Sequence, residues 1–423
     1  MVVSRRVFAV AVPLVLALAL VGAAGPSAAP AGTDLDARAD ALARKILIVD
    51  THIDLPERLK DKMEDVCNAT PDGNFDYPRA KEGGLKAGFM AIYIPASTEE
   101  GAAARAEADR LIDLVESIAS RCPDKFALAR SPADVRRIAK SGKIALPMGL
   151  ENGSPLVGDL AALTHLKKRG IRYVTLTHSE NNGLSDSSFA STRKWNGLSP
   201  EGKKAVAELN RLGIMVDVSH LSDDATRQVL ELSKAPVIAS HSSCRHFTPD
   251  WERNLADPEI RAIAAKGGVV QINFGAMFLR ADAQKQSTES WAAMRKYLEE
   301  HNIKRGSEEA RKFRESYLKE HPRIYGDVSD LVAHIDHVVQ IAGIDHVGLG
   351  SDFEGLGDGL PAGLKDASGY RNAIRALLEK GYSEGDIRKI CGENLLRVWT
   401  EIERAAEGQS GSVKQPQKKA SAS

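Results

Sequence analysis

The chain lacks an excess of charge of either sign, since its 423 residues carry 57 basic and 57 acidic side chains. With no basic stripe either, there is no electrostatic reason to expect a nucleic-acid partner. Cysteine is scarce as well. The four cysteines contain no Cys-x-x-Cys pair, which argues against a structural zinc knuckle, and sequence alone cannot choose among their disulfide pairings. They are Cys67, Cys122, Cys244 and Cys391.

Long apolar runs are confined to the N-terminus. Residues 1–32 contain Arg5 and Arg6, a short apolar core and then small residues, which is the pattern of a signal peptide. The stretch SRRVF also resembles a twin-arginine export signal, and a retained membrane anchor is the alternative. We therefore expect an exported bacterial protein, periplasmic or extracellular, with its mature domain at 33–406. Residues 407–423 are polar and of low complexity, which predicts a disordered tail.

No Gly-x-Gly-x-x-Gly turn follows any early apolar run, which disfavours a doubly wound nucleotide-binding sheet. Instead, eight short β-branched runs alternate with longer helical patterns. Such alternation indicates parallel strands joined by right-handed crossovers, and eight units predict a closed (β/α)₈ TIM barrel. The runs span residues 46–54, 88–95, 144–151, 171–178, 214–220, 236–242, 268–274 and 346–353.

The connection between the seventh and eighth runs is unusually long. Residues 279–327 are charged and rich in helix-forming side chains. They predict a helical insertion at this point of the barrel. Two interpretations stay open: a flap above the barrel mouth, or a solvated excursion with no role at the site.

Nearly every run finishes on a side chain capable of chemistry. Each alone has an ordinary explanation, because a His or Asp at a strand end often satisfies local hydrogen bonds. The whole set needs another explanation, because the strand ends meet at one pole of a barrel. Unpaired carboxylates buried there would each destabilise the fold by roughly several kcal/mol, so they require a partner. The residues are His52 and Asp54 on the first run, Glu151 on the third, His178, His220 and His241 on the fourth to sixth, and Asp352 on the eighth.

A divalent metal is the partner that this set of side chains predicts. Histidine and carboxylate ligands without thiolate suit Zn²⁺ first, with Mn²⁺, Fe²⁺ or Co²⁺ as alternatives. Three histidines and two carboxylates fill two sites only if one carboxylate bridges and solvent completes each shell. Two-metal hydrolases of this kind hold their ions roughly 3.5–4 Å apart. We therefore expect two Zn²⁺ per chain.

The motifs resemble those of the membrane (renal) dipeptidase family, a branch of the metal-dependent amidohydrolase barrels. Many related barrels bridge their metals with a carboxylated lysine that ends the fourth strand. This chain has no lysine in IRYVTLTH, and Glu151 ends the third run, as the dipeptidase arrangement has it. The matching stretches, which run in order from residue 50 to 398, are DTHIDLP, GLENG, LTHSENNGLSDS, DVSHLSD, ASHSSCR, ERNLADPEI, VGLGSDFEG and CGENLLRV.

The resemblance implies a role for each site residue. His52 and Asp54 would hold one zinc ion, His220 and His241 the other, and Glu151 would be shared. His178 would stabilise the developing oxyanion without binding metal. The resemblance also brings in Arg253, as the side chain that binds the substrate's terminal carboxylate. Asp352 would act as the acid and base that moves a proton from the bridging water to the leaving amine.

The resemblance therefore implies a zinc-dependent dipeptidase that attacks peptide bonds with a metal-bridging hydroxide, including dipeptides with a D-residue at the C-terminus. One alternative is an amidohydrolase acting on another amide or a β-lactam, since the same centre attacks either carbonyl. Another is an exported metal- or peptide-binding protein without turnover. The expected partner is a dipeptide substrate, and a homodimer stays open. We expect neither nucleic-acid binding nor a stable membrane anchor. Animal members are lipid-anchored at the C-terminus, whereas the tail here is polar.

Overall fold

The computed structural model describes residues 32–304 and 306–412. Its strands form one parallel sheet in the order β10-β9-β8-β7-β6-β5-β2-β4-β3, with β1 beside β2. The sheet curls so that β1 reaches the far edge, where Ile53 forms a parallel bridge with Phe353. The strands are β1 (Ile48–Ile53), β2 (Leu85–Tyr93), β3 (Phe126–Leu128), β4 (Ile144–Leu146), β5 (Met148–Glu151), β6 (Ile171–Thr175), β7 (Met215–Asp217), β8 (Ile238–Ala239), β9 (Val269–Ile272) and β10 (Val347–Leu349).

The predicted (β/α)₈ barrel is confirmed, with two local differences. The third predicted run is divided at Pro147 into β4 and β5, because proline has no N–H to donate to a neighbouring strand. The run at 126–128 was not predicted as a strand. It forms β3, a three-residue strand that pairs only with β4 and lies at the end of the sheet order.

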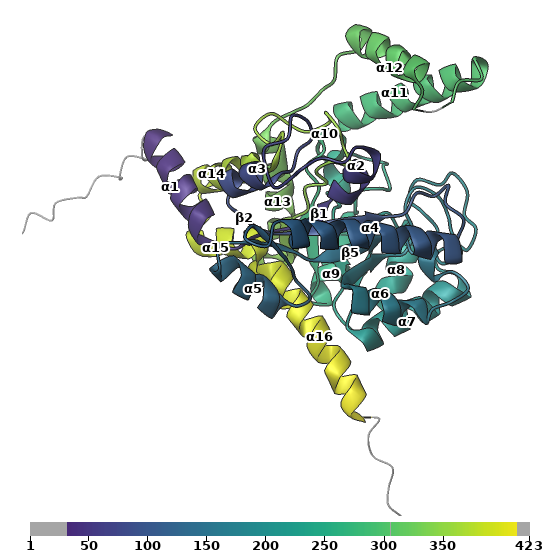
Figure 1. Cartoon of the computed structure of the whole chain (residues 1–423), viewed down its shortest axis with the longest axis horizontal. Helices are drawn as coiled ribbons and strands as arrows, with labels where there is room; N and C mark the ends of the chain where they lie inside the picture. The colour runs from purple at the N-terminus through teal and green to yellow at the C-terminus, as the bar shows by residue number, and fades with distance from the viewer. Residues whose placement is uncertain (1–31, 305, 413–423) are drawn as a thin grey trace, which may run out of the picture.

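Helices cover the sheet, as Figure 1 shows. Several begin at a serine whose hydroxyl accepts a hydrogen bond from the first turn, including Ser131, Ser199 and Ser222. The helices are α1 (Gly32–Lys45), α2 (Leu55–Asp61), α3 (Tyr77–Gly83), α4 (Ala102–Arg121), α5 (Pro132–Lys140), α6 (Ala162–Arg169), α7 (Pro200–Leu212), α8 (Asp223–Leu232), α9 (Asp257–Ala265), α10 (Ala276–Leu279), α11 (Ala281–Glu300), α12 (Glu308–Glu320), α13 (Val328–Ala342), α14 (Tyr370–Lys380), α15 (Glu384–Arg388) and α16 (Asn394–Ser412).

The barrel interior is filled from the end where α16 packs. One buried cluster combines side chains from strands all around the sheet with side chains of α16. Within it, Trp399 of α16 lies 5.3 Å from Phe89, measured between ring centroids, and Phe89 lies 5.5 Å from Tyr173. Tyr173 in turn contacts His52 near the opposite pole. This aromatic stack closes the amino-terminal pole and leaves chemistry to the carboxyl-terminal ends of the strands.

The predicted helical insertion between the seventh and eighth barrel strands is confirmed. It contains α11 and α12, which project from the barrel in Figure 1. The two helices pack on each other through the rings of Tyr297 and Phe313, which stack with centroids 3.9 Å apart. Asp327 closes the insertion by capping the N-terminus of α13.

The ends of the chain differ from the prediction in one respect. Helix α16 continues to Ser412, so residues 407–412 of the segment predicted as a disordered tail are helical. Residues 413–423 and all but the last residue of the predicted signal peptide lie outside the described residues. Among the described residues, no helix is long and apolar enough to cross a membrane.

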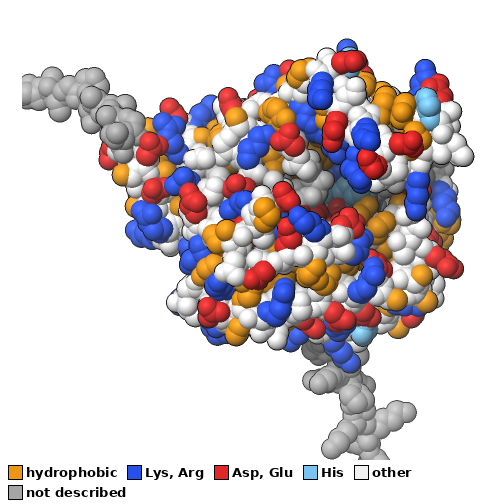
Figure 2. All heavy atoms as spheres, turned by 45° about the horizontal axis from the view of Figure 1, so that its top comes forward, with side chains coloured by type: hydrophobic (Ala, Val, Ile, Leu, Met, Phe, Trp, Pro, Cys, Tyr) orange, Lys and Arg blue, Asp and Glu red, His pale blue; other side chains and the backbone are white. Residues whose placement is uncertain are grey.

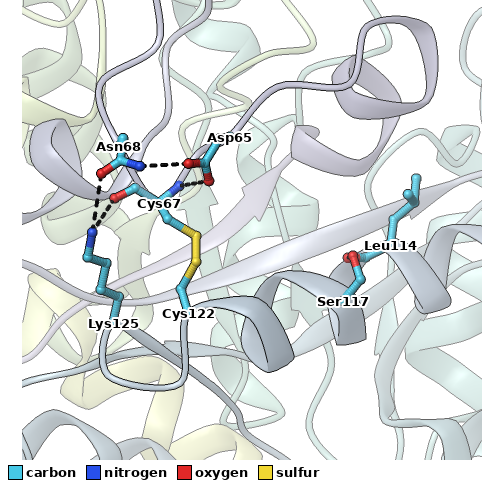
Figure 3. Close-up of a disulfide and its surroundings, with 7 residues drawn as sticks. All are labelled: Asp65, Cys67, Asn68, Leu114, Ser117, Cys122 and Lys125. Carbon is cyan, nitrogen blue, oxygen red and sulfur yellow. Dashed lines mark hydrogen bonds between the residues drawn. A yellow bond between two sulfur atoms is a disulfide. The ribbon is translucent and has the colours of Figure 1, made fainter.

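A disulfide joins Cys67, in the loop after α2, to Cys122 at the end of α4 (Figure 3). Their Cα atoms lie 6.3 Å apart. The loop is further held by Asp65, which accepts a hydrogen bond from the backbone N–H of Cys67, and by Lys125, which donates one to the Cys67 carbonyl. Cys244 and Cys391 are free and buried.

Candidate metal centre

The structure brings all of the predicted site residues to one pole of the barrel. His52 and Glu151 lie at the carboxyl-terminal ends of β1 and β5. Arg253 lies in the loop before α9, and the other site residues follow their strands within a few residues. Because the strands are parallel, their carboxyl ends share this pole. All of these side chains are buried except His178, which is partly exposed. Figure 2 shows the molecule with this face turned forward, and a hollow with histidine at its floor.

Glu151 lies at the centre of the cluster. Its Oε2 is 3.4 Å from Nε2 of His52. Its Oε1 is 3.1 Å from Nε2 of His220, 3.3 Å from that of His241 and 3.6 Å from that of His178. The two carboxylate oxygens therefore face different histidines, with His52 on one side and His220 and His241 on the other. This is the placement that a shared carboxylate ligand requires.

The His220 and His241 rings direct their Nε2 atoms at each other across 2.8 Å. Ser240 fixes the tautomer of His241. Its hydroxyl donates to Asp217, so it accepts from Nδ1–H of His241 at 2.7 Å, which leaves a lone pair on Nε2. Burial holds the pKa of both imidazoles well below its ordinary value. Both rings are therefore neutral, and a cation fits between them and Glu151.

His52 lies beside both Glu151 and Asp54. Its Nδ1 hydrogen-bonds Tyr173 Oη at 2.8 Å, and its buried Nε2 has no hydrogen-bond partner although Asp54 Oδ1 is 3.5 Å away. Burial acts to lower the pKa of His52, but Tyr173 and the two carboxylates raise it well above its usual value. Burial acts to raise the pKa of the Glu151 carboxyl, but the neighbouring histidines hold this pKa well below its usual value. The carboxylates thus require positive charge at this point.

Asp352 lies next to Asp54, and the two form a group with His52 whose ligand atoms are within 4.8 Å of one another. Burial, with a further contribution from Asp54, raises the pKa of Asp352 to about 8. The backbone of Asp352 is left-handed, with φ of 61°, a strained conformation for a residue other than glycine. Gly355 makes room for the pair, because a Cβ there would lie 2.4 Å from Asp54 and 2.6 Å from Asp352.

Arg253 is buried against the same group from the side of His220. Its guanidinium donates to Ser242 Oγ at 2.8 Å and to the His241 carbonyl at 3.0 Å, and Nη2 lies 3.0 Å from Nε2 of His220. One face of the guanidinium stacks on Phe278, 5.0 Å from the ring centroid. Burial lowers the pKa of Arg253 to about 10, so it stays charged at neutral pH.

Sequence reasoning missed the groups that orient the site. Asn273 donates to Asp352, and it follows β9, so the rule used for the other strand ends would have found it. Tyr173 lies in the middle of β6, where an aromatic residue reads as core. Ser240 and Asp217 are buried polar residues whose contact with a ring nitrogen depends on the tertiary fold.

The donor set fits divalent cations. It offers imidazole nitrogens and carboxylate oxygens without thiolate. Among its ring nitrogens, one each of His52, His178 and His220 is buried without a hydrogen-bond partner, and those of His220 and His241 face each other closely. The groups whose ligand atoms lie within 4.8 Å are His52 with Glu151 and His241, Glu151 with His178 and His220, and His52 with Asp54 and Asp352. Distance alone therefore leaves His178 as a further possible ligand.

Comparison with known proteins gives a consistent result. The family model described as membrane dipeptidase (peptidase family M19) matches residues 36–413. A curated relative, dipeptidase tcpJ of Claviceps purpurea, is 32% identical over 359 residues, which cover 83% of this chain and 75% of that protein.

Solved structures agree. The probable dipeptidase PvdM from Pseudomonas aeruginosa superposes with a TM-score of 0.77 and 32% identity, covering 88% of this chain and 99% of that one. A metallopeptidase from Rhodobacter sphaeroides, liganded with a phosphinate mimic of the dipeptide L-Ala-D-Ala, superposes with a TM-score of 0.70 and 27% identity, covering 84% of this chain and 99% of that one. The chain therefore belongs to the membrane dipeptidase family, peptidase family M19, and is a metal-dependent hydrolase of peptide bonds.

Proposed function

We propose that this enzyme hydrolyses dipeptides with two zinc ions held at the carboxyl-terminal pole of the barrel. His52 and Asp54 hold one ion, His220 and His241 hold the other, and Glu151 is shared. The position of Glu151 carries the proposal, because its two oxygens face different histidines at 3.1 to 3.4 Å. Zinc is the ion proposed because the ligands are histidine and carboxylate in a nearly dry site.

The bound ions would polarise the scissile carbonyl and make hydroxide available at neutral pH. Asp352 receives the proton of the attacking water and delivers it to the leaving amine. This role is supported by two observations: the Asp352 carboxyl is buried with a pKa raised to about 8, close to neutral pH, and Asn273 orients it. His178 is kept neutral, since burial lowers its pKa, and is placed to donate a hydrogen bond to the oxyanion.

Arg253 is proposed to bind the carboxylate at the C-terminus of the substrate. A guanidinium matches a carboxylate in charge and in hydrogen-bond geometry. Because Arg253 lies on the His220 side of Glu151, the C-terminal residue of the substrate lies on that side too. The amino-terminal residue then lies toward His52 and Asp54. The carboxylate of a dipeptide lies one residue beyond the scissile bond, whereas a peptide with more residues after that bond would place its carboxylate beyond Arg253.

A D-configured C-terminal residue is part of the proposal. The Rhodobacter sphaeroides relative is liganded with a mimic of L-Ala-D-Ala, at 27% identity to this chain. Export is proposed as well. The disulfide between Cys67 and Cys122 supports it, since structural disulfides form and persist in oxidising compartments.

The test is a peptide panel assayed with the purified enzyme, with and without a chelator, and with Zn²⁺ added back. We expect release of free amino acids from L,L and L,D dipeptides, loss of activity on chelation and recovery with Zn²⁺. Tripeptides and C-terminally amidated dipeptides are expected to be poor substrates. Equal cleavage of tripeptides and dipeptides would contradict the dipeptidase assignment. Activity that survives full metal removal would contradict the metal centre.

A further inference from the structure

Three aromatic side chains from different parts of the chain meet beside the metal centre. Phe189 lies in the long loop after β6, Trp251 in the loop before α9, and Trp291 on α11 of the insertion. The Phe189 ring centroid is 6.2 Å from that of Trp251 and 6.5 Å from that of Trp291. We call these three residues the aromatic wall.

The aromatic wall lies next to His220 and to the ring that supports Arg253. The Phe189 ring lies 5.9 Å from the ring of His220, measured between centroids. Trp251 lies 5.2 Å from Phe278, the ring on which the Arg253 guanidinium stacks. The wall is therefore on the side of His220 and Arg253.

The loop that carries Phe189 is held rigidly. The buried Asp186 carboxylate accepts hydrogen bonds from the backbone N–H groups of Lys194, Trp195 and Gly197. Arg193 joins this loop to the Trp251 loop, because it donates to the Ala190 carbonyl and forms an ion pair with Glu252. Phe189 and Trp251 are thus fixed relative to each other before substrate arrives, which reduces the entropy lost on binding.

Trp291 is the open part of the aromatic wall. Its side chain is 48% exposed, and among the described residues Met63 and Leu232 are the other large hydrophobic side chains with comparable exposure. A half-exposed indole beside a binding site is apolar surface that a ligand can cover, with a gain roughly proportional to the area removed from water. The insertion therefore brings apolar surface to the barrel mouth.

We propose that the aromatic wall binds the side chain of the substrate's C-terminal residue and gives the enzyme a preference for apolar side chains there. This inference rests on the proposed function, because Arg253 places the C-terminal residue on the wall's side. Trp291 is then a specificity residue supplied by the insertion, and the side chain of the amino-terminal residue does not reach it.

The test compares two matched series of dipeptides by their kcat/KM. One series varies the C-terminal residue (glycyl-glycine, glycyl-leucine, glycyl-phenylalanine), and the other varies the amino-terminal residue (leucyl-glycine, phenylalanyl-glycine). The enzymes are the unmodified protein, Trp291→Ala, Trp291→Phe and the control Lys296→Ala. Lys296 is an exposed residue of the same helix, and its side chain forms an ion pair with Glu300.

For Trp291→Ala we expect kcat/KM for glycyl-leucine or glycyl-phenylalanine, divided by kcat/KM for glycyl-glycine, to fall by about tenfold. This is the low end for an apolar contact in a specificity pocket. Trp291→Phe should retain most of this ratio, and Lys296→Ala should leave it unchanged. In all variants, kcat/KM for leucyl-glycine or phenylalanyl-glycine relative to glycyl-glycine should stay the same. An unchanged C-terminal series, or an equal fall in both series, would overturn the proposal. Failure of the unmodified enzyme to cleave any dipeptide would instead refute the proposed function on which it rests.

Discussion

Asn273 donates a hydrogen bond of 2.8 Å from Nδ2 to Oδ2 of Asp352. Its own Oδ1 accepts from the backbone N–H of Gly275 at 2.7 Å, which fixes the orientation of the amide. One oxygen of Asp352 is thereby engaged, and the other, Oδ1, lies on the side of Gly355 and Asp54. A proton-transfer group needs such an orientation, because efficiency depends on geometry before pKa.

The first prediction follows for Asp352→Asn. The variant should retain its metal and lose about 10²- to 10⁴-fold in kcat, the usual contribution of a general base. Metal analysis together with steady-state kinetics checks both parts. Loss of metal along with activity would identify Asp352 as a ligand, contrary to the assignment.

The second prediction concerns Arg253→Ala. We expect a rise in KM for free-acid dipeptides of about tenfold or more, since a charge-assisted hydrogen bond contributes roughly 1.5–3 kcal/mol. The difference in KM between free-acid and C-terminally amidated substrates should become smaller. Arg211→Ala, which removes an exposed arginine paired with Glu208, is the control and should leave this difference unchanged. An equal loss on acid and amide would show that Arg253 has a structural role only.

The third prediction is a pH dependence of stability from His334. Its Nδ1 accepts the backbone N–H of Cys244 at 3.0 Å, and Nε2 donates to the Leu279 carbonyl at 3.1 Å, so the neutral ring is fully bonded. Burial lowers the pKa of His334 from 6.5 to about 4. Between these values the unfolded chain binds a proton that the folded protein does not. The free energy of unfolding therefore falls as pH falls from 6.5 to 4, by at most about 3 kcal/mol from this residue.

Urea unfolding at several pH values, with chelator present to remove metal effects, measures this dependence. His334→Gln should flatten the decline between pH 6.5 and 4. His301→Gln, at an exposed position in the insertion, should not. Equal slopes for His334→Gln and the unmodified protein would contradict the prediction.

The fourth prediction concerns the disulfide. Cys67 and Cys122 are separated by 55 residues, and closing a loop of that length restricts the unfolded chain. Replacing both with alanine should lower the free energy of unfolding by about 2–4 kcal/mol. Activity at 25 °C should persist, because neither cysteine is among the described contacts of the metal centre. No change in stability on replacement, or on reduction of the unmodified protein, would count against a structural disulfide.

The fold was predictable from sequence because each barrel strand is a continuous apolar run, and both faces of such a strand are covered. The exceptions have local causes. Pro147 divides one strand. Strand β3 lies in an apolar stretch of residues 126–129 between Lys125 and Arg130, shorter than the runs that predicted the other strands. The helical extension of α16 to Ser412 was missed because the polar composition of this segment indicates only that it does not fold by itself. A helix already nucleated on the barrel extends by further residues at little free-energy cost.

The site was predictable as a set and not in its detail. Parallel strands bring their ends together, so His220, His241 and Glu151 had to be neighbours once a barrel was assigned. The facing of the two ring nitrogens, and the Ser240 contact that sets the His241 tautomer, depend on side-chain geometry that no spacing encodes. The cysteine pairing likewise needed the distance between Cα atoms.

The central claim is a binuclear centre with Glu151 shared between both ions. Its most direct test is the metal content of the purified, active enzyme, measured per chain by inductively coupled plasma mass spectrometry, alongside Glu151→Gln as the fifth prediction. We expect two ions per active chain in the unmodified enzyme. In Glu151→Gln we expect fewer ions together with a lower rate, because one substitution weakens both sites. One ion or none in the fully active enzyme, or two ions and near-normal turnover in Glu151→Gln, would contradict it.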